Sequence, residues 1–325
     1  MTEQVVDVGR GISLAYEQIG EPDAEPMILV AGLGQQLHSW PTEFCELLAG
    51  RGYRIVRFDN RDAGRSTHAT FRPPSVAAAI ARRWPAEQYD LTDLATDTVG
   101  LLDALGYLDA HVVGISMGGM IAQLVAARWP HRVRTLTSMM SMTGSRRAGR
   151  PALSTWRLMA ARPPATRQGS IDHAIRMFRH IGSRGFAFDE AEVRELAGLA
   201  YDRDPSRAGV ARQLAAIFRS GDRTAALRAI TAPTLVVHGD RDRMVHPSGG
   251  EATARAIPGA QLVTIPGLGH DLPRGAWPTL LDFIDTHAHR GGIDTPAQRG
   301  GIDTPAHRRG GRARLTGSAD APSAS

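Results

Sequence analysis

The chain has 325 residues, of which 42% are hydrophobic and 22% are charged. These fractions are typical of a globular protein, and the length fits one large α/β domain or two smaller domains. Apolar runs such as residues 27–33 are far shorter than the roughly 20 residues that a membrane span requires. Residues 1–7 do not resemble a secretory signal, and Cys45 is the single cysteine. We therefore expect a cytoplasmic protein without an intrachain disulfide.

The net charge of +5 gives little reason to expect a nucleic-acid partner. All 38 basic residues are arginine. Residues 288–325 hold six arginines and three aspartates, so this end carries +3 of the net charge and the first 287 residues carry only +2. A nearly neutral folded part is not the basic surface of a nucleic-acid-binding protein.

The C-terminal residues 288–325 change in composition and contain a repeat. Residues 290–297 read R-G-G-I-D-T-P-A, and residues 299–306 repeat this sequence. Gly, Pro, Ser and Arg dominate this end. Because it could bury too little apolar surface to offset the entropy cost of ordering, we predict a disordered tail. Six arginines opposed by three aspartates would allow at most weak contact with an anionic membrane.

Short apolar runs alternate with segments of helical period over residues 1–287. Several runs are apolar at consecutive positions, which is typical of strands buried on both faces of a parallel sheet. The predicted strands are Ile12–Gln18, Met27–Val30, Arg54–Phe58, His111–Val113, Val133–Met139, Leu235–His238 and Leu262–Ile265. Helices are predicted at Glu43–Ala49, Leu91–Leu105 with Thr92 or Asp93 as its cap, Met117–Trp129, Gly249–Ala256 and Pro278–His287.

This alternation stops between residues 145 and 224, where only helical patterns occur. The patterns lie near Ile171–Ile181, Ala191–Tyr201 and Arg207–Arg219. Eighty residues are too many for a loop, so they predict an inserted helical subdomain. The expected fold is α/β, with a doubly wound, mostly parallel sheet formed by residues 1–144 and 225–287.

Ser116 has the sequence context of a catalytic nucleophile. The segment G-I-S-M-G at 114–118 follows a predicted strand and opens a predicted helix. A tight strand-turn-helix with small flanking residues exposes the serine hydroxyl at the helix N-terminus. The Met117 N–H would then face an oxyanion, and the loop at 31–36, A-G-L-G-Q-Q, could present the Leu33 N–H as a second donor.

A serine nucleophile needs a base and a group that orients the base. Among twelve histidines, His270 lies in a glycine-rich loop between the last predicted strand and helix. The acid is expected between serine and histidine in chain order. Asp240 and Asp242 both follow the strand at Leu235–His238, and their spacing does not distinguish them.

These motifs together resemble the α/β-hydrolase superfamily over residues 1 to about 287. The segment H-G-D-R-D at 238–242 is similar to the family's H-G-x-x-D, and this likeness favours Asp242 as the acid. The segment F-D-N-R-D-A-G-R-S at 58–66 is similar to the family's D-x-R-G-x-G-x-S turn, with Asp62 where glycine is usual. Ala31-Gly32 stands where the family has His-Gly. The chain most resembles actinobacterial esterases and lipases of the aclacinomycin methylesterase and mycobacterial LipG kind, in which a helical insertion covers the site.

The resemblance implies a serine hydrolase that cleaves a carboxylic ester, a thioester or a lipid ester through an acyl-enzyme. It implies Ser116, Asp242 and His270 as the triad, Leu33 and Met117 as oxyanion donors, and neither metal nor organic cofactor. Two alternatives remain open. One is cofactor-free haloperoxidase or perhydrolase activity on the same triad, and the other is a ligand-binding protein on a hydrolase scaffold. The expected partner is a small-molecule or lipid ester, and no oligomeric state is predicted.

Overall fold

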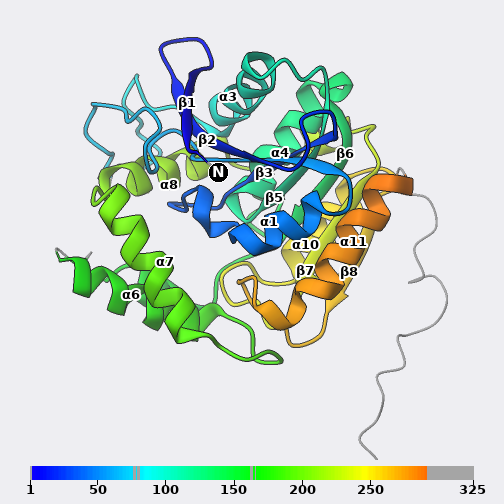
Figure 1. Cartoon of the computed structure of the whole chain (residues 1–325). Coiled ribbons are helices and arrows are strands. Elements are labelled where there is room, and N and C mark those ends of the chain that lie inside the picture. Colours follow the sequence, from blue (N-terminus) through cyan, green and yellow to red (C-terminus); the bar gives the residue numbers. More distant parts are fainter. Residues whose placement is uncertain (1, 76–77, 79–80, 162–163, 165, 291–325) are drawn as a thin grey trace, which may run out of the picture.

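The computed structural model describes residues 2–75, 78, 81–161, 164 and 166–290. Its centre is an eight-stranded sheet in the order β1-β2-β4-β3-β5-β6-β7-β8 (Figure 1). In this order, β1 pairs antiparallel with β2, and β2 pairs antiparallel with β4. All later pairs, from β4–β3 to β7–β8, are parallel. The strands are β1 (Gln4–Asp7), β2 (Ser13–Ile19), β3 (Glu25–Val30), β4 (Tyr53–Phe58), β5 (Ala110–Ile115), β6 (Val133–Met139), β7 (Thr234–Gly239) and β8 (Gln261–Ile265).

Consecutive residues of the central strands pack into two separate cores. In β3, Ile28 and Val30 belong to one hydrophobic cluster, whereas Met27 and Leu29 belong to the other. Side chains of a strand point alternately to its two faces, so a continuous apolar run indicates burial on both faces. This explains why the central strands were recognisable from the sequence, within a few residues at each end.

Helices cover both faces of the sheet (Figure 1). On one face lie α3 (Leu91–Ala104), α4 (Met117–Arg128), the short α9 (Thr224–Leu227) and α10 (Ser248–Ala256). On the other face lie α1 (Thr42–Ala49) and α11 (Trp277–Arg290), which contact each other. The doubly wound α/β architecture predicted from the sequence is confirmed.

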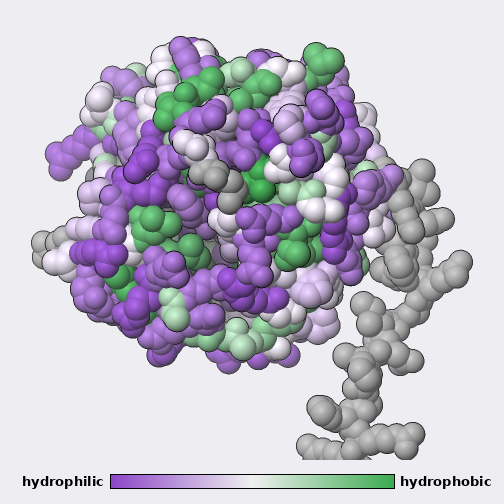
Figure 2. Space-filling view, viewed as in Figure 1, coloured by the Kyte–Doolittle hydropathy of each residue, from purple (hydrophilic) through white to green (hydrophobic). Residues whose placement is uncertain are grey.

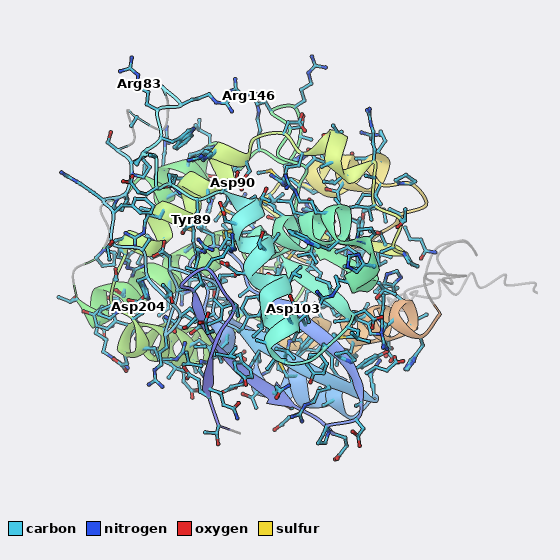
Figure 3. The ribbon with its side chains drawn as sticks, turned by 90° about the horizontal axis from the view of Figure 1, so that it is seen from above. Arg83, Tyr89, Asp90, Asp103, Arg146 and Asp204 are labelled. Atoms are coloured by element: carbon cyan, nitrogen blue, oxygen red, sulfur yellow. The ribbon has the colours of Figure 1, made fainter. Side chains whose placement is uncertain are left out.

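The cap of α3 differs from the prediction. Asp90 precedes the helix, and its carboxylate accepts a hydrogen bond from the Thr92 N–H at 2.6 Å, while the Asp93 carboxylate accepts from the Asp90 N–H at 2.9 Å. This reciprocal capping box satisfies N–H groups that a helix leaves unpaired at its start. Figure 3 shows Asp90 and Asp103 at opposite ends of the helix. Asp90, rather than Thr92 or Asp93, is therefore the capping residue.

Between β6 and β7 the described residues form helices and no strand. We call α5–α8 and the loops that join them the helical segment. Its helices are α5 (Leu153–Met159), α6 (Arg167–Ile181), α7 (Glu190–Arg203) and α8 (Ala208–Ser220). In Figure 1, α6 and α7 project to one side of the sheet and lie against each other.

Two buried arginines join the helical segment to the loop after β4. Arg212 of α8 holds the Asp62 carboxylate with two hydrogen bonds, of 2.8 and 2.6 Å, and the Tyr89 hydroxyl donates to the same carboxylate at 2.7 Å. Arg203 of α7 binds Asp59 at 2.8 Å and Glu3 at 2.8 Å. Such two-pronged arginine–carboxylate contacts fix geometry as well as charge, so α7 and α8 are attached to the core by buried polar contacts.

The surface in Figure 2 shows hydrophobic residues as separate patches among hydrophilic ones. Among the described residues, none of the helices has the length and hydropathy to span a bilayer. The last helix, α11, continues to Arg290, beyond the expected end at His287. The remainder of the predicted tail, 291–325, lies outside the described residues.

His287 is a buried histidine of α11 that has no part in any predicted site. Its side chain is 1% exposed, and its Nε2 lies 3.2 Å from the Leu136 carbonyl oxygen. Burial lowers the pKa of His287 to about 4, although hydrogen bonds to the Leu136 and Pro233 carbonyls act in the opposite direction. The folded protein therefore keeps this imidazole neutral at pH values where the unfolded chain protonates it.

This difference predicts a loss of stability as the pH falls from about 6.5 to about 4, because only the unfolded state gains the proton. At most about 3 kcal/mol of unfolding free energy is involved, given about 1.4 kcal/mol per pKa unit. The His287→Gln variant keeps an amide that can donate to Leu136. Between pH 7.5 and pH 4.5, urea unfolding should show a smaller loss of unfolding free energy in this variant than in the parent. Equal losses in the two proteins would contradict the prediction.

Candidate active site

Ser116 lies in the turn between the end of β5 and the start of α4. Its backbone has φ 57° and ψ −120°, a conformation that non-glycine residues rarely adopt. Hydrogen bonds hold the turn on both sides, since the Ser116 N–H donates to the Met139 carbonyl at 2.9 Å and the Ser141 hydroxyl donates to the Ser116 carbonyl at 2.8 Å. The surrounding structure therefore maintains the strained turn that G-x-S-x-G predicts.

Two glycines permit this turn because neighbouring backbone leaves no room for a side chain. A Cβ on Gly114 would lie 2.2 Å from the Gly118 oxygen, and a Cβ on Gly118 would lie 2.0 Å from the Val30 oxygen. The first turn of α4 consequently packs directly against the end of β3. This close approach places Ser116 beside the loop that follows β3.

His270 connects Ser116 to Asp242 by hydrogen bonds. Its Nε2 lies 3.0 Å from Ser116 Oγ, and its Nδ1 lies 2.7 Å from Asp242 Oδ2. Because a carboxylate can only accept, Nδ1 carries a proton and donates it to Asp242. The neutral imidazole then presents the lone pair of Nε2 to the serine hydroxyl. The three residues follow β5, β7 and β8, whose carboxyl ends meet at one edge of the parallel sheet.

Asp242 is fully buried and held by several donors. Its Oδ1 accepts from the Met244 and Val245 N–H groups, each at 2.8 Å, and its Oδ2 lies 3.4 Å from His238 Nε2. Burial alone would raise the pKa of Asp242, but the charge of His270 and the hydrogen bonds from His238 and His270 lower it to about 2. The carboxylate therefore stays ionised beside the imidazole throughout the neutral range.

Asp240, the other aspartate that the spacing allowed, does not contact His270 in the described structure. Its carboxylate accepts from the Gly267 N–H at 2.6 Å and lies 3.5 Å from Arg241. Asp240 thus supports the start of the loop that carries the histidine. The contact of His238 with Asp242 could be anticipated only from the place of His238 in the H-G-x-x-D motif.

Met117 follows Ser116 in the chain, and Leu33 lies in the loop that follows β3. Neither main-chain N–H makes a hydrogen bond to any described residue. Gly32, which precedes Leu33, lies so close to the serine that an added Cβ would be 3.4 Å from Ser116 Cβ. This loop is held by the Asn60 amide, which donates to the Ala31 carbonyl at 3.1 Å, and by Gln213 of α8, which accepts from the Gly34 N–H at 2.8 Å. Two unpaired main-chain donors near one hydroxyl can stabilise an oxyanion.

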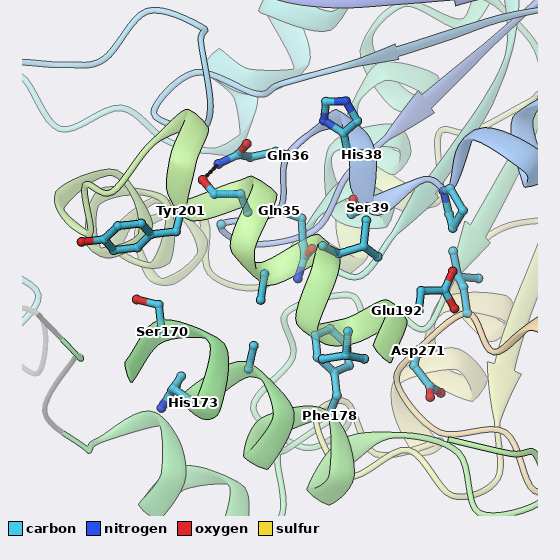
Figure 4. A pocket seen from close by; sticks show the side chains of 18 of the residues that line it. Gln35, Gln36, His38, Ser39, Ser170, His173, Phe178, Glu192, Tyr201 and Asp271 are labelled. Atoms are coloured by element: carbon cyan, nitrogen blue, oxygen red, sulfur yellow. Dashed lines mark hydrogen bonds between the residues drawn. The ribbon is translucent and has the colours of Figure 1, made fainter. Parts of the chain in front are cut away.

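A cavity of about 460 Å³ lies between this loop and the helical segment. Ser116 and His270 do not line it, but Gly34 and Asp271, neighbours of the site in sequence, do. In Figure 4, Asp271 and Glu192 lie well away from Tyr201 and Ser170. Apolar side chains that line the cavity include Phe178, Phe188, Leu196, Val210 and Leu272.

The described residues contain no group of three or more His, Cys, Asp or Glu side chains arranged to hold a metal ion. Cys45 is buried, and burial raises the pKa of its thiol to about 12. Its Sγ lies 3.8 Å from the Trp40 carbonyl oxygen. The thiol is therefore inert at neutral pH.

The packing of the turn predicts that Gly118→Ala will disrupt the site. The added methyl group would overlap the Val30 carbonyl, so we expect a stability loss of several kcal/mol or failure to fold. Gly50→Ala is the matched control, because an added Cβ there would meet no heavy atom nearer than 3.4 Å. Thermal melting of both variants tests this, and a Gly118→Ala protein as stable as Gly50→Ala would show that the turn tolerates a side chain.

Comparison with known proteins shows which family the chain resembles. A family model described as alpha/beta hydrolase fold matches residues 25–273. The rhodomycin D methylesterase DauP of Streptomyces sp. (strain C5) is 30% identical over 299 residues, which cover 85% of this chain and 95% of the relative. The bifunctional esterase/perhydrolase DCH of Acinetobacter calcoaceticus is 25% identical over 277 residues, or 81% of this chain and 91% of the relative.

The fold is also similar to that of solved hydrolase structures. A hydrolase from Pseudomonas aeruginosa superposes with a TM-score of 0.64 at 25% identity, over 89% of this chain and 98% of that protein. The family model covers most of the chain, including the ends of the three strands that Ser116, Asp242 and His270 follow. The chain belongs to the alpha/beta hydrolase fold family.

Proposed function

We propose that this protein is a serine hydrolase that cleaves a carboxylic ester of a small molecule through an acyl-enzyme. The observation that carries the proposal is the hydrogen-bonded chain from Asp242 through His270 to Ser116, with distances of 2.7 and 3.0 Å. The names of the relatives, a methylesterase and an esterase/perhydrolase, support ester cleavage as the reaction.

In the first half of the proposed reaction, Ser116 Oγ attacks the ester carbonyl carbon while its proton passes to His270 Nε2. The imidazolium that forms is stabilised by Asp242, which also keeps Nδ1 as the protonated nitrogen. The carbonyl oxygen becomes an oxyanion, and we propose that the unpaired Leu33 and Met117 N–H groups donate hydrogen bonds to it. Because these donors are fixed before the reaction, they need no reorganisation as the charge develops.

The tetrahedral intermediate then collapses and breaks the bond between the carbonyl carbon and the alcohol oxygen. His270 Nε2 returns its proton to that oxygen, and the alcohol leaves. Water next attacks the acyl-Ser116 carbonyl and gives a proton to Nε2. Collapse of the second intermediate returns that proton to Ser116 Oγ and releases the carboxylic acid.

We further propose that the helical segment acts as a lid that bounds the substrate pocket. The cavity of about 460 Å³ lies in the range of small-molecule sites and has both apolar and polar side chains in its walls. The Gln36 amide donates to the Ala200 carbonyl of α7 at 2.8 Å, so the loop beside the proposed oxyanion donors also contacts the segment (Figure 4). The name of one relative, a rhodomycin D methylesterase, supports a methyl ester as the substrate to test first.

Ser116→Ala tests the proposed nucleophile. Removing the hydroxyl should lower kcat for p-nitrophenyl esters by several orders of magnitude, on the order of 10⁶ as for another serine hydrolase. Covalent labelling by a fluorophosphonate, followed by mass spectrometry of the intact protein, should disappear in the variant. Stoichiometric labelling of Ser116→Ala would exclude this serine as the nucleophile.

A pair of aspartate variants tests the assignment of the acid. In Asp242→Asn the amide can no longer favour the productive imidazole tautomer, so kcat should fall by roughly 10⁴. Asp240→Asn keeps a side-chain oxygen that can accept from Gly267, and it should cost less than about tenfold. Steady-state kinetics on both proteins checks this ranking, and the reverse ranking would assign the orienting role to Asp240.

A further inference from the structure

The loop that carries His270 is bound by the helical segment as well as by the core. Residues 181–185, the end of α6 and the start of its connection to α7, lie along the loop of residues 267–271. The His270 N–H donates to the Ile181 carbonyl at 2.9 Å. The Arg184 and Gly185 N–H groups both donate to the Gly267 carbonyl, each at 2.9 Å.

Ser183 makes side-chain contacts on both sides of His270. Its hydroxyl oxygen accepts from the Gly269 N–H at 2.9 Å and donates to Asp271 Oδ1 at 2.5 Å. Its main-chain N–H donates to the same carboxylate, at 3.0 and 3.1 Å from the two oxygens. One serine therefore bonds the residue before the histidine and the residue after it.

Glycines bring the two backbones into direct contact. A Cβ on Gly185 would lie 2.7 Å from Gly267 Cα, and a Cβ on Gly269 would lie 2.3 Å from the carbonyl carbon of Gly182. No side chain separates the segments at these points. On its other side the loop meets the core, where Asp240 accepts from the Gly267 N–H at 2.6 Å. The histidine loop is thus held between the core and the helical segment.

We infer that Ser183 is a positioning residue for His270 and that the helical segment contributes through it to the proposed reaction. The inference rests on the proposed function, because it assumes that His270 is the base. Ser183 does not reach the reacting atoms. It fixes the main chain at 269 and 271, and the imidazole between them consequently keeps its 3.0 Å distance to Ser116 Oγ. A lid attached in this way stays in place at this edge of the site during turnover.

Ser183→Ala tests the inference, because it leaves the Gly269 N–H without its acceptor and removes one donor from Asp271. A misplaced base slows chemistry and leaves ester binding unchanged. We therefore expect kcat for a short p-nitrophenyl ester to fall by about 10- to 100-fold with KM within about twofold of the parent. Ser183→Thr keeps the hydroxyl and should restore kcat to within about threefold of the parent.

Thr166→Ala is the matched control at the other end of α6. The Thr166 hydroxyl caps this helix by accepting from the Gly169 N–H at 3.1 Å, and it does not line the cavity. Loss of an N-cap costs about 1 kcal/mol of stability, so the control weakens the same helix without touching the histidine loop. Its kcat should stay close to that of the parent. If Ser183→Ala keeps a parental kcat, or loses no more than Thr166→Ala, Ser183 has no positioning role.

Two further measurements keep the test decisive. If Ser183→Ala does not fold, Ser183→Cys supplies the same comparison, since a thiol is a weak donor and acceptor and should lower kcat in the same direction. Fluorophosphonate labelling of Ser116 separates the two proposals. Stoichiometric labelling of the Ser116→Ala protein contradicts the proposed function itself, whereas Ser116-dependent labelling at a parental rate in Ser183→Ala overturns only the role of Ser183.

Discussion

The close approach of α4 to β3 determines the geometry of the whole site. Gly118 lets the first helical turn rest against the Val30 carbonyl, and Gly114 lets the chain reverse direction immediately before it. Ser116 must then adopt a positive φ, and its hydroxyl faces the edge where the parallel strands end. A wider turn would separate Ser116 from the Leu33 loop, because that loop continues the strand against which Gly118 packs. The proposed nucleophile and both proposed oxyanion donors are thus located by one backbone contact.

Much of this architecture was predictable because burial on two faces leaves a local signal. Residues 27–30 and 235–238 read as uninterrupted apolar runs, and the structure shows them as central strands between two helical layers. The turn at Ser116 was recognisable because its cause is also local. Its glycines are required by backbone atoms only a few positions away or on the adjoining strand. The motif at Ser116 predicted an acid between serine and histidine in chain order, and the family resemblance favoured Asp242.

Other features leave no such signal. The edge strand β1 is largely exposed, so residues 4–7 carry neither an apolar run nor clear alternation. Helix α5 has seven residues, too few for a helical period to be recognised. Spacing also left Asp240 and Asp242 equivalent, because their difference lies in which carboxylate turns inward to His270 and which binds Gly267. The contact of Ser183 with Asp271 joins polar residues 88 positions apart, and each is unremarkable in its own segment.

Because Asp62 and Arg212 form a buried pair, the helical segment and the loop after β4 can change in sequence only together. The Asp62 carboxylate is fully buried beneath α8. A helical segment without the arginine would leave this carboxylate buried without its charged partner, at a cost of about 3–5 kcal/mol. The helical segment can therefore be replaced by another only together with the residue at position 62. Paralogues that diverge in substrate should retain or lose both members of the pair.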